Sequence, residues 1–326
     1  MRIVVTGSSG HLGEALMRSL RASGDEAIGL DRLASPFTDR IGSLVDAGFV
    51  HDTLAGADAV LHTATLHKPH VATHTRQEFV DSNVTGTLNV LEACVAHRVK
   101  SLVFTSTTSA FGAALTPPPG EPAAWIDETV RHVPKNIYGV TKIAAEDLCE
   151  LFHRRERLPC LILRTSRFFP EADDSAEIRD AYDDANAKVN ELLYRRVDIA
   201  DVVSAHRCAL DRAPAIGFDR YIISAATPLS PDDAAALRRD APGVIARYFP
   251  DYVEEYARRG WRMFPEFDRI YSSAKAVREL GWRPAFGFGE ALAALRDQRD
   301  YRSDLTLQIG RKGYHADTFA HGPYPV

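Results

Sequence analysis

A glycine-rich stretch near the amino terminus constrains the fold more than any other feature of this sequence. Gly7, Gly10 and Gly13 recur at every third position in TGSSGHLG. The apolar run at residues 2–5 predicts a buried strand before them, and residues 14–20 predict a helix after them. A strand, a glycine turn and a helix in this order are typical of a dinucleotide-binding fold.

The three glycines have different roles in such a turn. Gly7 allows the chain to turn at positive φ. Gly10 lets a diphosphate approach the backbone, and Gly13 lets helix and strand pack closely. The helix start then offers N–H groups and partial positive charge to the anion, unless the turn binds no ligand at all. The cofactor-binding residues predicted in this turn also include Ser9, His11 and Leu12.

A carboxylate follows at the spacing that selects the cofactor. Asp31 ends a second predicted strand, residues 26–30, and lies 18 positions after Gly13. A carboxylate about 20 residues beyond the glycines binds the adenosine ribose and repels a 2′-phosphate. The sequence therefore predicts NAD, although the neighbouring Arg32 could hold the 2′-phosphate of NADP. The alternative role of Asp31 is that of a strand-end turn residue.

Composition excludes several classes of protein. The 326 residues carry a net charge of -5, with no basic run that would predict nucleic-acid binding. No apolar run reaches the ~20 residues of a membrane span. The first predicted strand begins at Arg2, so we expect no signal peptide and a cytoplasmic protein. Cys94, Cys149, Cys160 and Cys208 form no CxxC pair, and we expect buried free thiols.

The first half of the chain alternates predicted strands and helices, which is typical of a parallel sheet with helices on both faces. Further strands are expected at 40–44, 57–64, 101–105 and 160–164, long helices at 80–97 and 138–154, and a long loop at 114–134. The alternation weakens after residue 166. We therefore predict an α/β, Rossmann-like doubly wound parallel sheet with a smaller C-terminal substrate-binding lid.

Domain boundaries follow from these changes of pattern. Residues 1–166 form the predicted NAD-binding domain, which is completed by about residues 195–225. Residues 167–194 and 226–300 are assigned to the lid. Residues 301–326, which are rich in glycine and proline toward their end, are expected to be an extended tail.

Tyr138 and Lys142 are candidates for proton transfer. They are four positions apart at the start of the 138–154 helix and share one face of it. A nearby ammonium, together with the positive nicotinamide ring, lowers the pKa of a phenol from its usual value of about 10. Tyr138 could then accept a proton from a substrate hydroxyl. A packed tyrosine beside a surface lysine is the alternative.

Polar and small residues at predicted strand ends complete the candidate site. Hydroxyls of Ser106 and Thr107 could hydrogen-bond a substrate oxygen, with Thr108 beside them. Asn83 either contacts the cofactor or caps the 80–97 helix. The remaining predicted cofactor-binding residues are Ser43, Leu44, Thr63, Ala64, Thr65, Thr105, Arg164 and Ser166.

Taken together, these motifs resemble the extended short-chain dehydrogenase/reductase superfamily, in its group of NAD-dependent epimerases and dehydratases, over roughly residues 1–300. The resemblance implies a Rossmann domain with a lid, and activity on sugars or sugar nucleotides. It implies Tyr138 as acid/base, Lys142 holding the nicotinamide ribose and tuning Tyr138, and Thr107 or Ser106 polarising the substrate oxygen. It also implies a homodimer through the two long helices.

Departures from the family pattern limit the class of reaction that the sequence predicts. Thr108 and Ser109 stand where the 4,6-dehydratases carry an Asp–Glu pair, which disfavours a dehydratase. Arg167 stands where 4-epimerases usually carry Asn, and RTSRFFPE is similar to the corresponding segment of uronate dehydrogenases. Arg167 could bind a substrate carboxylate or phosphate, or instead form a salt bridge to Glu171 or Asp173.

We expect no metal, because the histidines at 62, 67, 70 and 74 lack a tight ligand pattern. His67 is expected to help bind an anionic, sugar-type substrate. The sequence favours an NAD-dependent oxidoreductase that transfers hydride between NAD and a secondary hydroxyl of a sugar, sugar acid or sugar nucleotide. The alternatives are a nucleotide-sugar 4-epimerase that reduces NAD transiently, and a catalytically silent NAD-binding redox sensor.

Overall fold

Seven parallel strands form the main sheet of this protein, whose computed structural model describes residues 1–313 and 319. The strand order is β3-β2-β1-β4-β5-β7-β8, and all neighbours are parallel. The order reverses between β1 and β4, where a crevice opens at the carboxyl ends of the strands. The predicted Rossmann-like fold is confirmed. The strands are β1 (Arg2–Thr6), β2 (Glu26–Asp31), β3 (Arg40–Ile41), β4 (Ala59–His62), β5 (Ser101–Thr107), β7 (Cys160–Thr165) and β8 (Phe218–Ile223).

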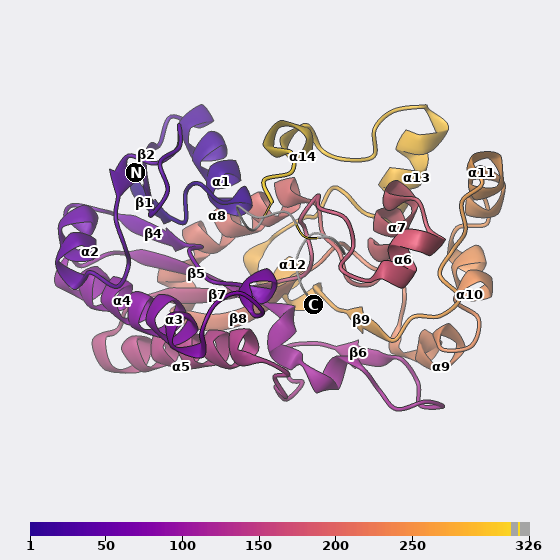
Figure 1. Cartoon of the computed structure of the whole chain (residues 1–326), viewed down its shortest axis with the longest axis horizontal. Helices are drawn as coiled ribbons and strands as arrows, with labels where there is room; N and C mark the ends of the chain where they lie inside the picture. Colours follow the sequence, from indigo (N-terminus) through magenta and orange to yellow (C-terminus); the bar gives the residue numbers. More distant parts are fainter. Residues whose placement is uncertain (314–318, 320–326) are drawn as a thin grey trace.

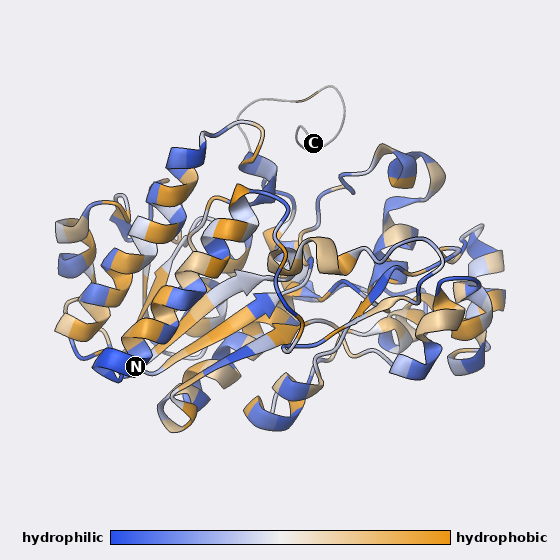
Figure 2. Ribbon diagram, turned by 90° about the horizontal axis from the view of Figure 1, so that it is seen from below, coloured by the Kyte–Doolittle hydropathy of each residue, from blue (hydrophilic) through white to orange (hydrophobic). Residues whose placement is uncertain are grey.

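Helices cover both faces of this sheet (Figure 1). Alternate strand residues point to opposite faces, so Ile3 and Val5 pack in one hydrophobic cluster and Val4 packs in another. Figure 2 shows the apolar strands enclosed between the helical layers. One layer contains α1 (His11–Ala22), α8 (Ile199–Ile216) and α12 (Ala274–Leu280), and the other contains α2 (Ala47–Leu54), α4 (Gly86–Ala96) and α5 (Ile137–Glu156).

A second hydrophobic cluster lies beyond the carboxyl ends of the strands, on the right of Figure 1. Its centre is aromatic, with the rings of Tyr194 and Phe267 stacked at 4.4 Å between centroids. A two-stranded parallel sheet, β6 (Ala124–Ile126) and β9 (Arg269–Tyr271), joins the predicted 114–134 loop to this body. Its helices are α6 (Ala176–Ala181), α7 (Asp184–Glu191), α9 (Ala234–Leu237), α10 (Ala241–Tyr248), α11 (Tyr252–Arg259) and α13 (Phe288–Arg296).

The long helix expected at 80–97 is divided into three parts. Helix α3 (Arg76–Val80) leads into a π-helical turn at Asp81–Thr85, and α4 follows. Short 3₁₀ turns occur at Lys68–His70, Thr108–Phe111, Ala113–Leu115 and Pro231–Asp233. No helix in residues 1–313 is long and apolar enough to cross a bilayer.

The carboxyl-terminal region differs from the expected extended tail. Residues 304–309 form α14 (Asp304–Ile309), which packs against α1 and α8 and buries Ile309. The tail beyond residue 313, apart from Phe319, lies outside the described residues. Trp282, assigned from sequence to the lid, packs instead in the α1/α8 cluster.

A substitution at Trp282 tests whether this residue belongs to the α1/α8 cluster. Its ring is 0% exposed, and its Nε1 donates to Ser204 Oγ at 2.9 Å. We expect Trp282→Ala to lower the free energy of unfolding by about 3–5 kcal/mol, because it leaves a cavity. Urea denaturation measures this. Val253→Ala, at a side chain 53% exposed, is the control and should stay within about 0.5 kcal/mol; equal effects would contradict the assignment.

Candidate functional site

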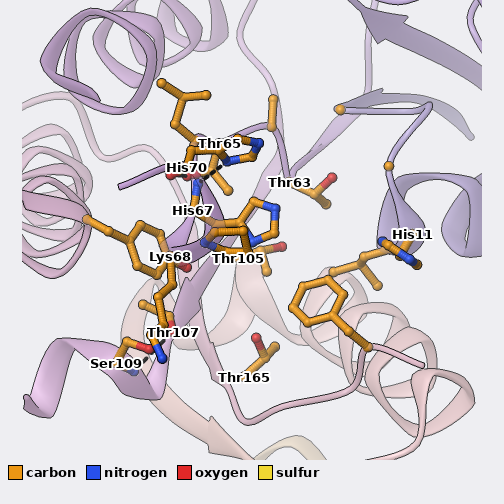
Figure 3. Close-up of a pocket in the computed structure, with 18 of the residues that line it drawn as sticks. His11, Thr63, Thr65, His67, Lys68, His70, Thr105, Thr107, Ser109 and Thr165 are labelled. Atoms are coloured by element: carbon orange, nitrogen blue, oxygen red, sulfur yellow. Dashed lines mark hydrogen bonds between the residues drawn. The ribbon is translucent and has the colours of Figure 1, made fainter. Parts of the chain in front are cut away.

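A cavity of about 1530 Å³ lies along the carboxyl ends of the main-sheet strands, between the sheet and the lid. Its volume exceeds the ~300–1,000 Å³ typical of a single small-ligand pocket. Figure 3 shows His11 on one side of it and His67, Lys68 and His70 on another, with Thr105, Thr107 and Thr165 from the sheet edge. The predicted site residues that line it are Gly7, Ser9, Gly10, His11, Leu12, Gly13, Asp31, Arg32, Ser43, Leu44, Thr63, Ala64, Thr65, His67, Thr105, Ser106, Thr107, Thr108, Tyr138, Ser166 and Arg167.

The glycine turn has the geometry that a diphosphate requires. Gly7 adopts φ +74°, and a Cβ on Gly13 would lie 1.9 Å from the Gly7 carbonyl oxygen. Gly10 caps α1 with no side-chain hydrogen bond, so no side chain occupies the first N–H groups of the helix. Those groups and the helix dipole favour a bound phosphate. The residues present therefore fit a dinucleotide.

Asp31 stands at the end of β2, on the cavity wall. Its Oδ2 accepts a hydrogen bond from the Ser9 backbone N–H at 3.0 Å, and its Oδ1 accepts one from Leu33 at 3.0 Å. The carboxylate therefore fixes the glycine turn as well as presenting negative charge at the site. Its position agrees with an adenosine-ribose acceptor.

Tyr138 and Thr107 meet on the cavity wall. Helix α5 begins there because the Asn136 side chain accepts the Gly139 N–H at 3.0 Å, which places Tyr138 in the first turn. Burial raises the pKa of Tyr138 to about 12, against the opposite effect of its hydrogen bond with Thr107. Thr107 Oγ1 also accepts the Ser109 N–H at 3.0 Å, so its hydroxyl is well oriented.

Lys142 is not among the residues that line the cavity, and its contact with the nicotinamide ribose stays a prediction. Its Nζ donates to the Thr105 carbonyl oxygen at 2.7 Å and lies 3.9 Å from the centroid of the Phe104 ring. Burial lowers the pKa of Lys142 to about 7. In this structure the lysine therefore holds the end of β5.

Arg164 is also outside the cavity, although the sequence predicted a cofactor ligand. Its side chain is 2% exposed and its Nη2 donates to Glu146 Oε2 at 2.7 Å. Glu146 also accepts the Ser106 hydroxyl at 2.5 Å and the Arg220 Nε at 3.2 Å. Burial opposes ionisation, yet these partners lower the pKa of Glu146. The Ser106 hydroxyl is therefore engaged by the buried Glu146. The Thr107 hydroxyl is the one that faces Tyr138.

Asn83 lies inside a π-helical turn and not at a helix cap, and it is not among the residues that line the cavity; its contact with the cofactor stays a prediction. It is 2% exposed. Its Oδ1 accepts the Leu66 N–H at 2.8 Å, and its Nδ2 donates to the Leu66 carbonyl at 2.9 Å and to Thr141 at 3.0 Å. Asn83 therefore fastens the loop after β4 to α5.

Ion pairs organise the lid side of the cavity. Arg167 pairs with Asp173, with Asp174 at 2.6 Å and with Glu191 at 3.4 Å. The salt bridge to Asp173 is thus formed, and the guanidinium is not available to grip a substrate with both nitrogens. Lys68 pairs with the same Asp174. In the part of the chain that the structure describes, no three His, Cys, Asp or Glu side chains form a metal-binding group.

Sequence reasoning missed Lys312, which lines the cavity from near the end of the chain. The Nζ of Lys312 donates to the Ser9 carbonyl at 2.8 Å, within the glycine turn. No motif marks this lysine, because the contact joins residues 303 positions apart.

The buried Glu146–Arg164 pair generates a prediction for stability. Glu146→Gln keeps the side-chain shape but leaves Arg164 as an uncompensated buried charge, so unfolding should become easier by about 3–5 kcal/mol in urea titrations. Asp147→Asn, one position on at a side chain 71% exposed, should change stability by less than about 0.5 kcal/mol. A Glu146→Gln protein as stable as the parent would refute this role.

Curated proteins align with parts of this chain. A UDP-glucose 4-epimerase from Halalkalibacterium halodurans is 30% identical over 165 residues, which cover 47% of this chain and 46% of the relative. A uronate dehydrogenase from Pseudomonas putida is 26% identical over 178 residues, which cover 52% of this chain and 62% of the relative. The chain thus spans about half the length of the first of these relatives.

Solved structures extend the likeness to nearly the whole fold. A short-chain dehydrogenase/reductase superfamily protein from Agrobacterium tumefaciens, solved with bound NAD, superposes with a TM-score of 0.64 at 24% identity, covering 91% of this chain and 97% of that one. The sequence profile of the NAD dependent epimerase/dehydratase family matches residues 3–223. The chain therefore belongs to the NAD-dependent epimerase/dehydratase family, and NAD is its cofactor.

Proposed function

We propose that this protein oxidises a secondary hydroxyl of a sugar, sugar acid or sugar nucleotide with NAD. The observation that carries the proposal is the contact between Tyr138 and Thr107 on the wall of the cavity that the glycine turn also lines. A proton acceptor and an oriented hydroxyl thus face the space beside the dinucleotide site. Alcohol oxidation requires a group that accepts the hydroxyl proton and a group that hydrogen-bonds the reacting oxygen.

In this mechanism NAD, when bound, supplies the hydride acceptor. Thr107 holds the substrate oxygen, since its own hydroxyl is already oriented by the Ser109 N–H. Tyr138 Oη, once deprotonated to the phenolate, takes the hydroxyl proton, and the phenol that results is the proton donor in the reverse direction. Both side chains are at least nine-tenths buried, so the polar contacts act with little competition from water.

The substrate is proposed to be anionic. Lys68, Arg195 and Arg269 line the cavity together with His67. Each of these three cations is paired with a carboxylate, and cations of this kind still attract carboxylates and phosphates. Arg167 contributes to the field, although its nitrogens are paired with carboxylates. A sugar acid agrees with the similarity to the uronate dehydrogenase, and a sugar nucleotide with the size of the cavity.

A 4-epimerase is the second candidate, because a UDP-glucose 4-epimerase is 30% identical over 165 residues and the family profile matches residues 3–223, which include Tyr138. Incubation with NAD and a panel of free sugar acids and UDP-sugars distinguishes the two. NADH that accumulates in proportion to consumed substrate supports the dehydrogenase. An epimeric product without net NADH supports the epimerase, and no reaction with any compound despite NAD binding favours the redox sensor.

We also propose a homodimer through the helices expected at 80–97 and 138–154, which in the structure are the segment from Val80 to the end of α4 and helix α5. Val80, Val140 and Leu151 on these helices are 36%, 48% and 39% exposed. Apolar side chains gathered on one helical face are typical of an interface. A partner helix pair would cover them.

The two adjacent hydroxyl residues generate a matched prediction. Thr107→Val removes the hydroxyl that faces Tyr138 and should lower kcat by about 10²–10³-fold, as for other groups that stabilise charge on a reacting oxygen. Ser106→Ala should mainly reduce stability, because its hydroxyl serves Glu146. Steady-state kinetics and thermal melting measure both variants. A larger kcat loss in Ser106→Ala would reverse the assignment.

Asp31 generates a prediction for cofactor choice. Asp31→Asn keeps an oxygen for the Ser9 N–H but removes the charge that repels a 2′-phosphate. The affinity for NADPH relative to NADH should therefore rise by about tenfold or more, since like-charge juxtaposition costs several kcal/mol. Fluorescence titration with both nucleotides measures this ratio. Asp52→Asn, at a side chain 77% exposed on α2, should leave it unchanged; an unchanged ratio in Asp31→Asn would reject the role.

A further inference from the structure

The chain end returns to the glycine turn along a fixed path. Helix α14 is held by Asp198, which accepts hydrogen bonds from the Ser303 N–H at 3.1 Å and from the Thr306 hydroxyl at 3.0 Å. The helix ends at Gly310, whose φ of +62° turns the chain away from the α1/α8 surface. Residues 311–313 therefore start from an anchored position, although the sequence pattern there predicts an extended tail.

Residues 311–313 are fastened to the lid side of the cavity. Arg311 donates to the Pro170 carbonyl at 3.1 Å and pairs with Asp184 at 3.0 Å. The backbone N–H groups of Lys312 and Gly313 both donate to Glu171 Oε1, at 3.0 and 3.1 Å. Two successive backbone donors on one oxygen fix the direction of the chain at this point.

The same carboxylate reaches the glycine turn. Glu171 Oε1 lies 2.8 Å from His11 Nε2, in the first turn of α1. Burial opposes ionisation of Glu171, but the bonds to His11 and to the backbone lower its pKa to about 2. Glu171 is therefore ionised at neutral pH and joins residues 312 and 313, the lid segment and α1 at one atom.

This arrangement places the Lys312 ammonium beside the glycine turn, where the diphosphate of a dinucleotide would bind. The Nζ of Lys312 is 2.8 Å from the Ser9 carbonyl and 2.5 Å from Glu14 Oε2. An ammonium has three donors, so one remains beyond these two contacts. Glu14 is shared with Arg18, whose Nη2 lies 2.7 Å away, so Lys312 is one of two cations that neutralise this carboxylate.

We propose that Lys312 is a ligand of the NAD diphosphate, supplied by the chain end to the glycine turn. The inference rests on the family's cofactor and adds a residue outside the motifs that predicted it. Lys312 lines the same cavity as Gly10, His11 and Leu12. A phosphate at the start of α1 gains a charge-assisted hydrogen bond from the ammonium.

The test measures binding rather than turnover, with the full chain and two probes. ADP-ribose contains the diphosphate, and adenosine lacks it. Lys312→Met should weaken ADP-ribose binding by about tenfold in isothermal titration calorimetry, the range of a lost hydrogen bond to a charged group. Adenosine binding should be unchanged, and Lys312→Arg should retain most of the ADP-ribose affinity.

Two controls separate this role from a structural one. Glu14→Gln breaks the ion pair but leaves the cation, so ADP-ribose should bind as tightly as before or more tightly. Lys100→Met removes a lysine that is 75% exposed and pairs with Asp58, and should change neither probe. Equal ADP-ribose affinity in Lys312→Met, or an equal loss for adenosine, would overturn the inference. A parent protein that binds neither probe would overturn the cofactor site itself.

Discussion

The buried carboxylate of Glu146 is the interaction on which the geometry of the site depends. It is 1% exposed, yet it accepts hydrogen bonds from β5 through Ser106, from β7 through Arg164 and from β8 through Arg220. Helix α5 is thereby tied to three strands at one point, two turns below Tyr138. Thr107 follows Ser106 directly. The hydrogen bond from Ser106 to Glu146 therefore also sets the distance between the phenol of Tyr138 and the Thr107 hydroxyl that faces it.

The glycine turn forms the opposite wall of the cavity, and its geometry requires residues that lack a Cβ. The contact between Gly13 and the Gly7 carbonyl leaves no room for a Cβ, so α1 can begin directly beneath the crevice between β1 and β4. Asp31 stiffens this turn by accepting the Ser9 N–H. A rigid, positively polarised turn on one wall, and Tyr138 and Thr107 on the other, leave an elongated space between them that suits an extended dinucleotide.

Local patterns predicted the parts of this site whose position follows from neighbouring residues. The glycine turn, Asp31 at the end of β2 and Tyr138 in the first turn of α5 needed only the strand–helix alternation. Arg164, Asn83 and Lys142 were expected beside the cofactor, but each side chain is engaged by another element. Their direction depends on Glu146, Leu66 and Thr105, which are distant in sequence or are reached through backbone atoms.

Other differences arise in the same way. The expected 80–97 helix contains a π-helical turn because Asn83 must face the loop after β4, and hydrophobic periodicity carries no sign of that. Helix α14 has too few residues to show amphipathic periodicity, and its contacts with α1 and α8 decide its structure. A tertiary contact across 303 positions, such as that of Lys312 with Ser9, has no local signature.

Burial disfavours the charged forms of both Tyr138 and Lys142. It raises the pKa of the phenol to about 12 and lowers that of the ammonium to about 7, so each group is driven toward its neutral form. A positive charge that enters the cavity beside Tyr138 favours the phenolate. Tyr138, the proton acceptor proposed for this site, is therefore expected to ionise more readily when a cationic ring lies beside it.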